Sequence, residues 1–177
     1  MSEQPNQFIR FLRSLRAVRE YTPEAVSEDV IRDIVEVGRW AGSSSNSQPT
    51  EVLVVRDVAM KQLIGDNGAR PAIGAAVALL VLTAGNPERT DSEAFDNGRL
   101  VERLLLAAKA HGLGANIATI KGDGPQIVGK ALGVPPEKRV WTVVTIGHTD
   151  VEARKARPAN PTAGRKPSDA FVHWEKY

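Results

Sequence analysis

Two arginines near the start of the chain have the type and spacing to bind an anion. Arg16 and Arg19 stand three residues apart in the segment RAVREY. Guanidinium groups at that spacing can point the same way and form a fork for a phosphate. Two solvated arginines fit this segment about equally well, so the segment alone leaves both interpretations open.

A second segment is polar and rich in small residues. Residues 41–49 read AGSSSNSQP and follow a predicted helix. Such a loop exposes backbone groups and hydroxyls that can hydrogen-bond the edge of a planar heterocycle. Taken alone, it fits a flexible surface loop better. It is not a P-loop, since GxxxxGK[ST] is absent, and not a dinucleotide-binding fingerprint, since no GxGxxG follows a strand.

A third basic segment, Arg165-Lys166-Pro167, fits a basic linker when it is taken alone. The other groups that could do chemistry are sparse. The chain has no cysteine, three scattered histidines, and neither an HExxH nor a GxSxG motif. We therefore expect no metal site and no catalytic side chain. Any redox chemistry would have to come from a bound cofactor.

Length and composition favour one ordinary folded domain spanning residues 1–177. The chain is 42% hydrophobic and 25% charged, with a net charge of +2. So small a surplus gives little attraction to nucleic acid or to a membrane surface. The first 18 residues lack the apolar core of a signal peptide, and the uncharged stretch 71–87 is short for a membrane span. We expect a cytoplasmic protein.

The elements that must position these segments alternate along the chain. Apolar periodicity and capping residues predict helices at 4–15, 27–40, 57–64, 92–111 and 126–132, and strands at 51–55, 75–83, 115–120 and 139–146. This order predicts an α/β or α+β protein with one mixed sheet. Residues 150–177 are rich in proline and charge and end in aromatics, so we expect them to pack on the core or on another subunit.

In their order along the chain, the segments resemble the nitroreductase family over about residues 10–175. The resemblance rests on RAVREY, AGSSSNSQPTEVLVV, LLLAAKAHGLGANIATI, LGVPPEKRVWTVVTIGHTD and RKPSDAFVHWEKY. It implies a nitroreductase-like α+β fold with a mixed central sheet flanked by helices. It also implies a homodimer with two FMN sites at the interface, and residues 150–177 extending onto the partner.

The resemblance also implies roles for individual residues. Arg16 and Arg165 match the phosphate-binding positions, and Arg19 matches the basic residue at the pyrimidine end of the flavin. The loop after the first long helix would reach the flavin from the other subunit. Residues 117–119 would lie beside the isoalloxazine, where a backbone N–H can hydrogen-bond N5. The full expected cofactor-binding set is Arg16, Ala17, Arg19, Gly42, Ser43, Ser44, Asn46, Gln48, Ile117, Ala118, Thr119, Arg165 and Lys166.

The implied function is an FMN-dependent oxidoreductase that carries electrons from NAD(P)H to an organic acceptor such as a nitroaromatic or quinone. In the implied ping-pong cycle, NAD(P)H gives a hydride to N5 and leaves, and the acceptor takes the same place. Neither the preference between NADH and NADPH, nor FMN against another flavin or deazaflavin, nor the acceptor is legible in the sequence.

Departures from the family pattern keep alternatives open. Leu15 and Ala17 stand where relatives often carry Arg and Ser, Gly42 stands where Pro is usual, and the stretch 85–95 is short. An FMN-binding or cofactor-sequestering protein with little turnover is one alternative, and a specialised flavin enzyme of the same fold is another. A nucleic-acid binder is disfavoured, because residues 150–177 hold six Lys/Arg against four Asp/Glu.

Overall fold

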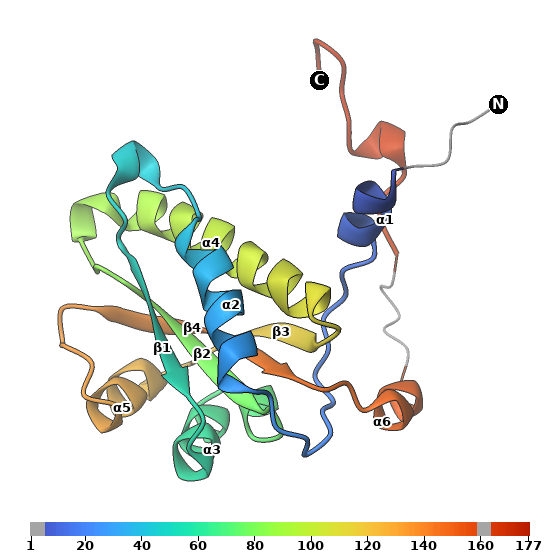
Figure 1. Ribbon diagram of the computed structural model, residues 1–177. Coiled ribbons are helices and arrows are strands. Elements are labelled where there is room, and N and C mark those ends of the chain that lie inside the picture. The colour runs from blue at the N-terminus through green and yellow to red at the C-terminus, as the bar shows by residue number, and fades with distance from the viewer. Residues whose placement is uncertain (1–5, 159–163) are drawn as a thin grey trace.

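The computed structural model describes residues 6–158 and 164–177 (Figure 1). Its centre is a four-stranded sheet in the order β1-β2-β4-β3. The strands are β1 (Thr50–Val55), β2 (Val77–Thr83), β3 (Gly114–Thr119) and β4 (Arg139–Gly147). Every residue of β2 is buried, which confirms the central strand predicted from the apolar run at 75–83.

Helices cover both faces of the sheet, so the body of the molecule has three layers (Figure 1). Val77, Leu79 and Val81 of β2 pack with α2 (Glu28–Arg39) and α4 (Thr90–Ala110). The alternate β2 residues pack on the other face with α3 (Val58–Asp66) and α5 (Gly124–Ala131). A strand buried on both sides needs apolar residues at successive positions, which is the pattern that β2 has.

The predicted helix boundaries are confirmed where capping chemistry is clear. The side chain of Ser27 accepts from the Val30 N–H at the start of α2, and Asp57 accepts from the Met60 N–H at the start of α3. Gly112, with φ 74°, follows the end of α4. Helix α4 begins at Thr90, two residues before the predicted start, because a 3₁₀ turn over Pro87–Arg89 leads directly into it.

The α+β class is confirmed, but the expectation of a mixed sheet is wrong for the described strands. All three strand pairs, β1–β2, β2–β4 and β3–β4, are antiparallel. Helix α4 joins β2 to β3 as a crossover that would suit parallel neighbours. Strand β4 then inserts between them and runs opposite to both, so no parallel pair forms.

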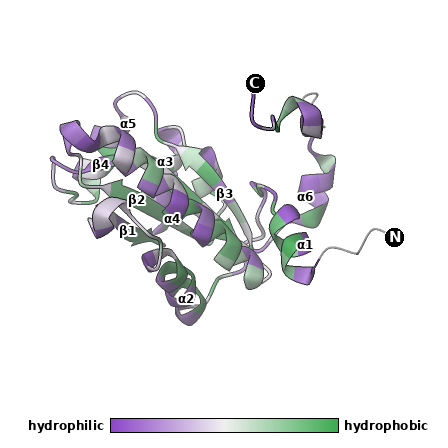
Figure 2. Cartoon of the chain, turned by 90° about the horizontal axis from the view of Figure 1, so that it is seen from above, coloured by the Kyte–Doolittle hydropathy of each residue, from purple (hydrophilic) through white to green (hydrophobic). Residues whose placement is uncertain are grey.

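The two ends of the chain lie outside these layers (Figures 1 and 2). Helix α1 (Gln7–Arg13) has no buried residue, and its residue Phe8 is 67% exposed. Helix α6 (Val151–Ala156), which the proline- and charge-rich composition concealed, is capped by Asp150. Residues 1–5, where the predicted first helix begins, are outside the described part. No helix in the described ranges is long and apolar enough to cross a membrane.

Candidate functional site

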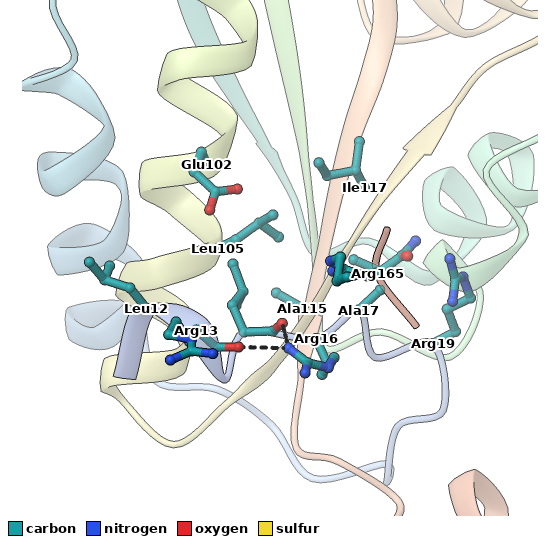
Figure 3. Close-up of a pocket in the computed structure, with 12 residues that line it drawn as sticks. Leu12, Arg13, Arg16, Ala17, Arg19, Glu102, Leu105, Ala115, Ile117 and Arg165 are labelled. Atoms are coloured by element: carbon teal, nitrogen blue, oxygen red, sulfur yellow. Dashed lines mark hydrogen bonds between the residues drawn. The ribbon is translucent and has the colours of Figure 1, made fainter. Parts of the chain in front are cut away.

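A pocket of about 680 Å³ lies beside the outer strand β3, between α1, the segment after it, and α4 (Figure 3). Residues far apart in the sequence meet there, including one from the C-terminal segment. Its volume is typical of a small-molecule or cofactor site. The lining residues are Leu12, Arg13, Leu15, Arg16, Ala17, Arg19, Glu102, Leu105, Ala115, Asn116, Ile117 and Arg165.

The segment that carries Arg16 and Arg19 is fixed to the sheet by its middle residue. The N–H of the buried Val18 donates to Ala115 O at 2.8 Å. The Tyr21 hydroxyl lies 2.6 Å from Val18 O and 2.8 Å from Thr145 Oγ1. Burial raises the pKa of Tyr21 to about 12, although the Thr145 hydrogen bond opposes the rise. Tyr21 therefore stays a neutral donor that ties this segment to β4.

The pocket is strongly positive. Four arginines line it, at positions 13, 16, 19 and 165, and Glu102 is the one acidic residue among the lining side chains. In residues 6–158 and 164–177, none of the four arginines forms an ion pair with a carboxylate. Arg16 Nη1 donates to the carbonyls of Arg13 and Leu15, both at 2.8 Å, which restrains its guanidinium (Figure 3). The arrangement suits a phosphate or another anion.

The outer edge of β3 adds backbone donors. In a strand, the N–H and C=O of one residue point to the same side, and the side alternates along the chain. Because Ala115 O faces outward to Val18, the backbone groups of Ile117 and Thr119 face outward too. The Ile117 side chain is 47% exposed and lines the pocket. The pocket thus has a hydrogen-bonding edge beside its basic side chains.

The structure brings together five of the expected cofactor-binding residues: Arg16, Ala17, Arg19, Ile117 and Arg165. Ala118 and Thr119 continue β3 beyond Ile117, and Lys166 follows Arg165. The expected residues of loop 42–48 do not line this pocket. Of these, Gly42, Ser43 and Gln48 line smaller cavities beside Asp96 of α4, of about 70 Å³ and 280 Å³.

Sequence reasoning missed several lining residues: Leu12, Arg13, Glu102, Leu105, Ala115 and Asn116. Two of them had a usable signal, because Glu102 and Leu105 are three residues apart on a predicted helix and therefore share a face. Arg13 is the last residue of α1, and its carbonyl accepts a hydrogen bond from Arg16. Asn116 is a buried polar residue whose Oδ1 has no hydrogen-bond partner among the described residues. Only the structure reveals that unsatisfied acceptor.

Loop 42–48 has an unusual backbone. Ser45, Asn46 and Gln48 have φ values of 52°, 53° and 47°. Such left-handed conformations are uncommon for residues other than glycine and concentrate at functional sites. The side chains of residues 44–48 are exposed, so the loop presents polar groups outward from a constrained backbone.

The buried carboxylate of Glu93 holds the turn at Gly85 and Asn86, near loop 42–48. Glu93 of α4 is 2% exposed and accepts from the N–H groups of Gly85 and Asn86 at 2.9 and 3.0 Å. Burial alone would raise the pKa of Glu93, but these two N–H groups favour its ionised form, and the pKa lies below its usual range. Both of its oxygens accept hydrogen bonds within the chain, so we assign Glu93 a structural role.

Comparison with known proteins finds one family that this chain is similar to. Residues 12–67 match the nitroreductase family. An FMN reductase [NAD(P)H] of Bacillus subtilis is 28% identical over 97% of this chain and 75% of its own length. Among solved structures, a candidate nitroreductase of Desulfovibrio desulfuricans in complex with FMN is 27% identical, with a TM-score of 0.78, over 98% of this chain and 99% of the other.

A more distant structure agrees in fold. A candidate NADH dehydrogenase/NAD(P)H nitroreductase from Parabacteroides distasonis is 22% identical, with a TM-score of 0.82, over 98% of this chain and all of the other. The sequence match covers the arginine segment, α2, loop 42–48, β1 and α3, and the structural likeness covers almost the whole chain. The chain is therefore similar to nitroreductase-family proteins.

Proposed function

We propose that the chain is an FMN-dependent NAD(P)H oxidoreductase and that the pocket beside β3 holds the FMN. The observation that carries the proposal is the convergence of four arginines, from both ends of the chain, on one cavity of cofactor size. Like charges gathered without carboxylate partners repel one another, and a bound anion relieves that repulsion. The names of the relatives, an FMN reductase and an FMN complex, point to the same ligand.

The residues present fit FMN by their chemistry. Arg16 and Arg165 supply guanidinium forks for a phosphate with nearly two negative charges. Leu12 and Leu105 supply apolar surface for a planar ring. Leu15 and Ala17 add apolar wall rather than further donors, so the phosphate depends on the arginines.

When bound, FMN supplies the redox chemistry, taking a hydride from NAD(P)H and passing the electrons to an organic acceptor. Arg19 holds positive charge at the pocket and stabilises negative charge that develops on the ligand. The outward N–H of Ile117 offers a fixed donor at the β3 edge. Donor and acceptor use the same open side in turn, which is a ping-pong scheme, and no side chain need transfer a proton.

We also propose a homodimer in which loop 42–48 completes the partner's site. Two observations support it: the loop lies outside the pocket of its own chain, and both chain ends expose large apolar side chains. Phe171 and Trp174 are 77% and 86% exposed, and Phe8 is also mostly exposed. Residues 150–177 then extend onto the partner. Light scattering coupled to size-exclusion chromatography should give twice the chain mass of 19.1 kDa.

The acceptor class that we propose is a small nitroaromatic, quinone or similar molecule, and the location is the cytoplasm. The net charge of +2 gives no reason to expect nucleic acid or a membrane as a partner.

The deciding experiment is the visible absorption spectrum of the purified protein, after incubation with FMN if needed, before and after anaerobic NADH or NADPH. Flavin bands that bleach on adding the donor are the expected result. Bands that persist would favour the alternative of a binding or cofactor-sequestering protein with little turnover. No bands after loading would refute the FMN site.

A further inference from the structure

The backbone of loop 42–48 needs an external restraint. Three residues within four positions, Ser45, Asn46 and Gln48, are left-handed without being glycine. Each such conformation is unfavourable for an L side chain and persists only where the surroundings impose it. The exposed side chains of residues 44–48 bury little surface that could impose it.

The restraint comes from a carboxylate of α4 that lies beneath the loop. The Ser44 N–H donates to Asp96 Oδ2 at 2.9 Å, and the Asp96 side chain is 3% exposed. Inside the loop, the Gln48 N–H donates to Ser43 Oγ at 2.9 Å. A buried carboxylate that accepts a backbone N–H forms a stronger hydrogen bond than a neutral acceptor does. Asp96 thus fixes the loop at Ser44, the first residue of its 3₁₀ turn Ser44–Asn46.

Arg99 covers this contact from the solvent side. Its Nη1 lies 3.6 Å from Asp96 Oδ1, an atom that is buried without a hydrogen-bond partner among the described residues. The guanidinium also packs on the backbone of Gly42, where an added Cβ would lie 2.5 Å from Nη2. Asp96 and Arg99 therefore hold two successive parts of the loop, its entry at Gly42 and its turn at Ser44.

We infer that Asp96 is a positioning residue for the flavin site, that it acts through loop 42–48, and that Arg99 secures it. This inference rests on the proposed function, because it assigns the loop to FMN binding. Asp96 is buried beneath the loop, which keeps the outward polar groups at residues 43–48 in one arrangement before FMN arrives. A preorganised loop does not have to be ordered on binding, so it binds more tightly than a loose one.

The test uses Asp96→Ala and Asp96→Asn in the full chain, with Asn97→Ala as the matched control. Asn97 is the next residue on α4, is 5% exposed, and has a buried Nδ2 without a hydrogen-bond partner in the described ranges. Hydrogen–deuterium exchange of the FMN-free protein reports the loop directly, with β2 as the internal measure of folding. Flavin fluorescence quenching then reports the Kd for FMN.

In Asp96→Ala we expect exchange in residues 43–48 to rise at least about tenfold, while β2 stays protected and the Kd for FMN rises about tenfold. Asp96→Asn keeps an acceptor for the Ser44 N–H, so it should restore most of the protection and most of the affinity. Asn97→Ala should leave loop exchange unchanged. Arg99→Ala, at an exposed side chain, should give a smaller rise in exchange.

Unchanged loop exchange in a folded Asp96→Ala protein would overturn the inference. Loop exchange as fast in Asp96→Asn as in Asp96→Ala would also overturn it. If Asp96→Ala also loses protection in β2, that variant is not properly folded, and the loop exchange of Asp96→Asn and Arg99→Ala then tests the inference. A rise in exchange without a change in Kd would show that the loop does not position FMN, which also overturns it. If the wild-type protein binds no FMN, the proposed function fails instead, and the exchange data show separately whether Asp96 holds the loop.

Discussion

The arginine pocket and loop 42–48 are built in opposite ways. In the pocket, the backbone is regular helix, strand and extended segment, and the ligand-binding power lies in exposed guanidinium groups. In the loop, the backbone itself is strained, and the charged group that matters, Asp96, is buried underneath. Both parts carry polar groups that face outward, but only one of them depends on backbone shape.

The difference teaches where each part is vulnerable. Exposed arginines act through charge, so their contribution is screened by salt and can be removed one residue at a time. A strained loop acts through geometry, so salt changes it little, and loss of the buried Asp96 anchor frees its turn. A site that combines the two obtains attraction from one part and orientation from the other.

The largest effect should follow from removing the two phosphate arginines. We expect Arg16→Ala combined with Arg165→Ala to weaken FMN binding by about 3 kcal/mol, roughly a hundredfold, taking the low end for charged hydrogen bonds because both side chains are exposed. Fluorescence titration at low and high salt measures it, and the double variant should also lose most of the salt dependence. Arg32→Ala, on the surface of α2, is the control. Wild-type affinity in the double variant would show that the phosphate of FMN does not bind in this pocket.

The next effect tests whether the pocket depends on its attachment to β3. In Gly114→Ala the new Cβ would lie 2.6 Å from Val18 Cγ1, so it would push the arginine segment off the sheet edge. We expect a loss of about 2 kcal/mol in unfolding free energy, measured in urea, with weaker FMN binding. Gly98→Ala on α4, where a Cβ meets nothing within 4 Å, should be neutral or slightly stabilising. Equal effects at the two glycines would contradict this account.

Tyr21 offers a smaller and pH-dependent test of the same attachment. Its folded pKa of about 12 lies above the usual tyrosine value of 10.0, so its contribution is complete below pH 10 and is lost as pH rises toward 12. Tyr21→Phe removes the hydrogen bonds to Val18 and Thr145, and should cost about 1 kcal/mol at neutral pH. Urea unfolding across the alkaline range should show a shallower decline for the Phe variant. The same decline in both proteins would exclude Tyr21 as its source.

Local chemistry in the sequence predicted most of the elements, because their causes are local. The apolar run of β2 and the caps at Ser27 and Asp57 each act within a few residues. The expectation of a mixed sheet was wrong, since β4 inserts between β2 and β3, a pairing of distant segments that makes every described strand pair antiparallel. Helix α6 was missed because its composition resembles a loop and only the Asp150 cap marks it.

The candidate site divides in the same way. The arginines were predictable by type, but their meeting depends on Arg165 reaching the pocket from the far end of the chain. Glu102 and Leu105 escaped prediction because helical periodicity was used to find the buried face of α4, whereas this pair borders a cavity. The role of Asp96 could not be predicted at all, because it depends on the left-handed turn of a loop whose Ser44 lies 52 residues earlier in the chain.

The smallest effect separates loop geometry from loop side chains. Ser45 has φ 52° and ψ 27°, whereas Ser47, two positions on, has φ −71° and ψ −17°. Glycine adopts the first conformation freely, so Ser45→Gly relieves backbone strain in the folded state. This gain offsets the greater conformational entropy that glycine gives the unfolded chain, and the unfolding free energy should change by less than about 0.5 kcal/mol. Ser47→Gly brings no such relief and should cost about 1 kcal/mol. Urea unfolding of the two variants side by side measures the difference. Equal losses would mean that the left-handed turn at Ser45 carries no strain, and the contrast between a charge-built pocket and a shape-built loop would lose its basis.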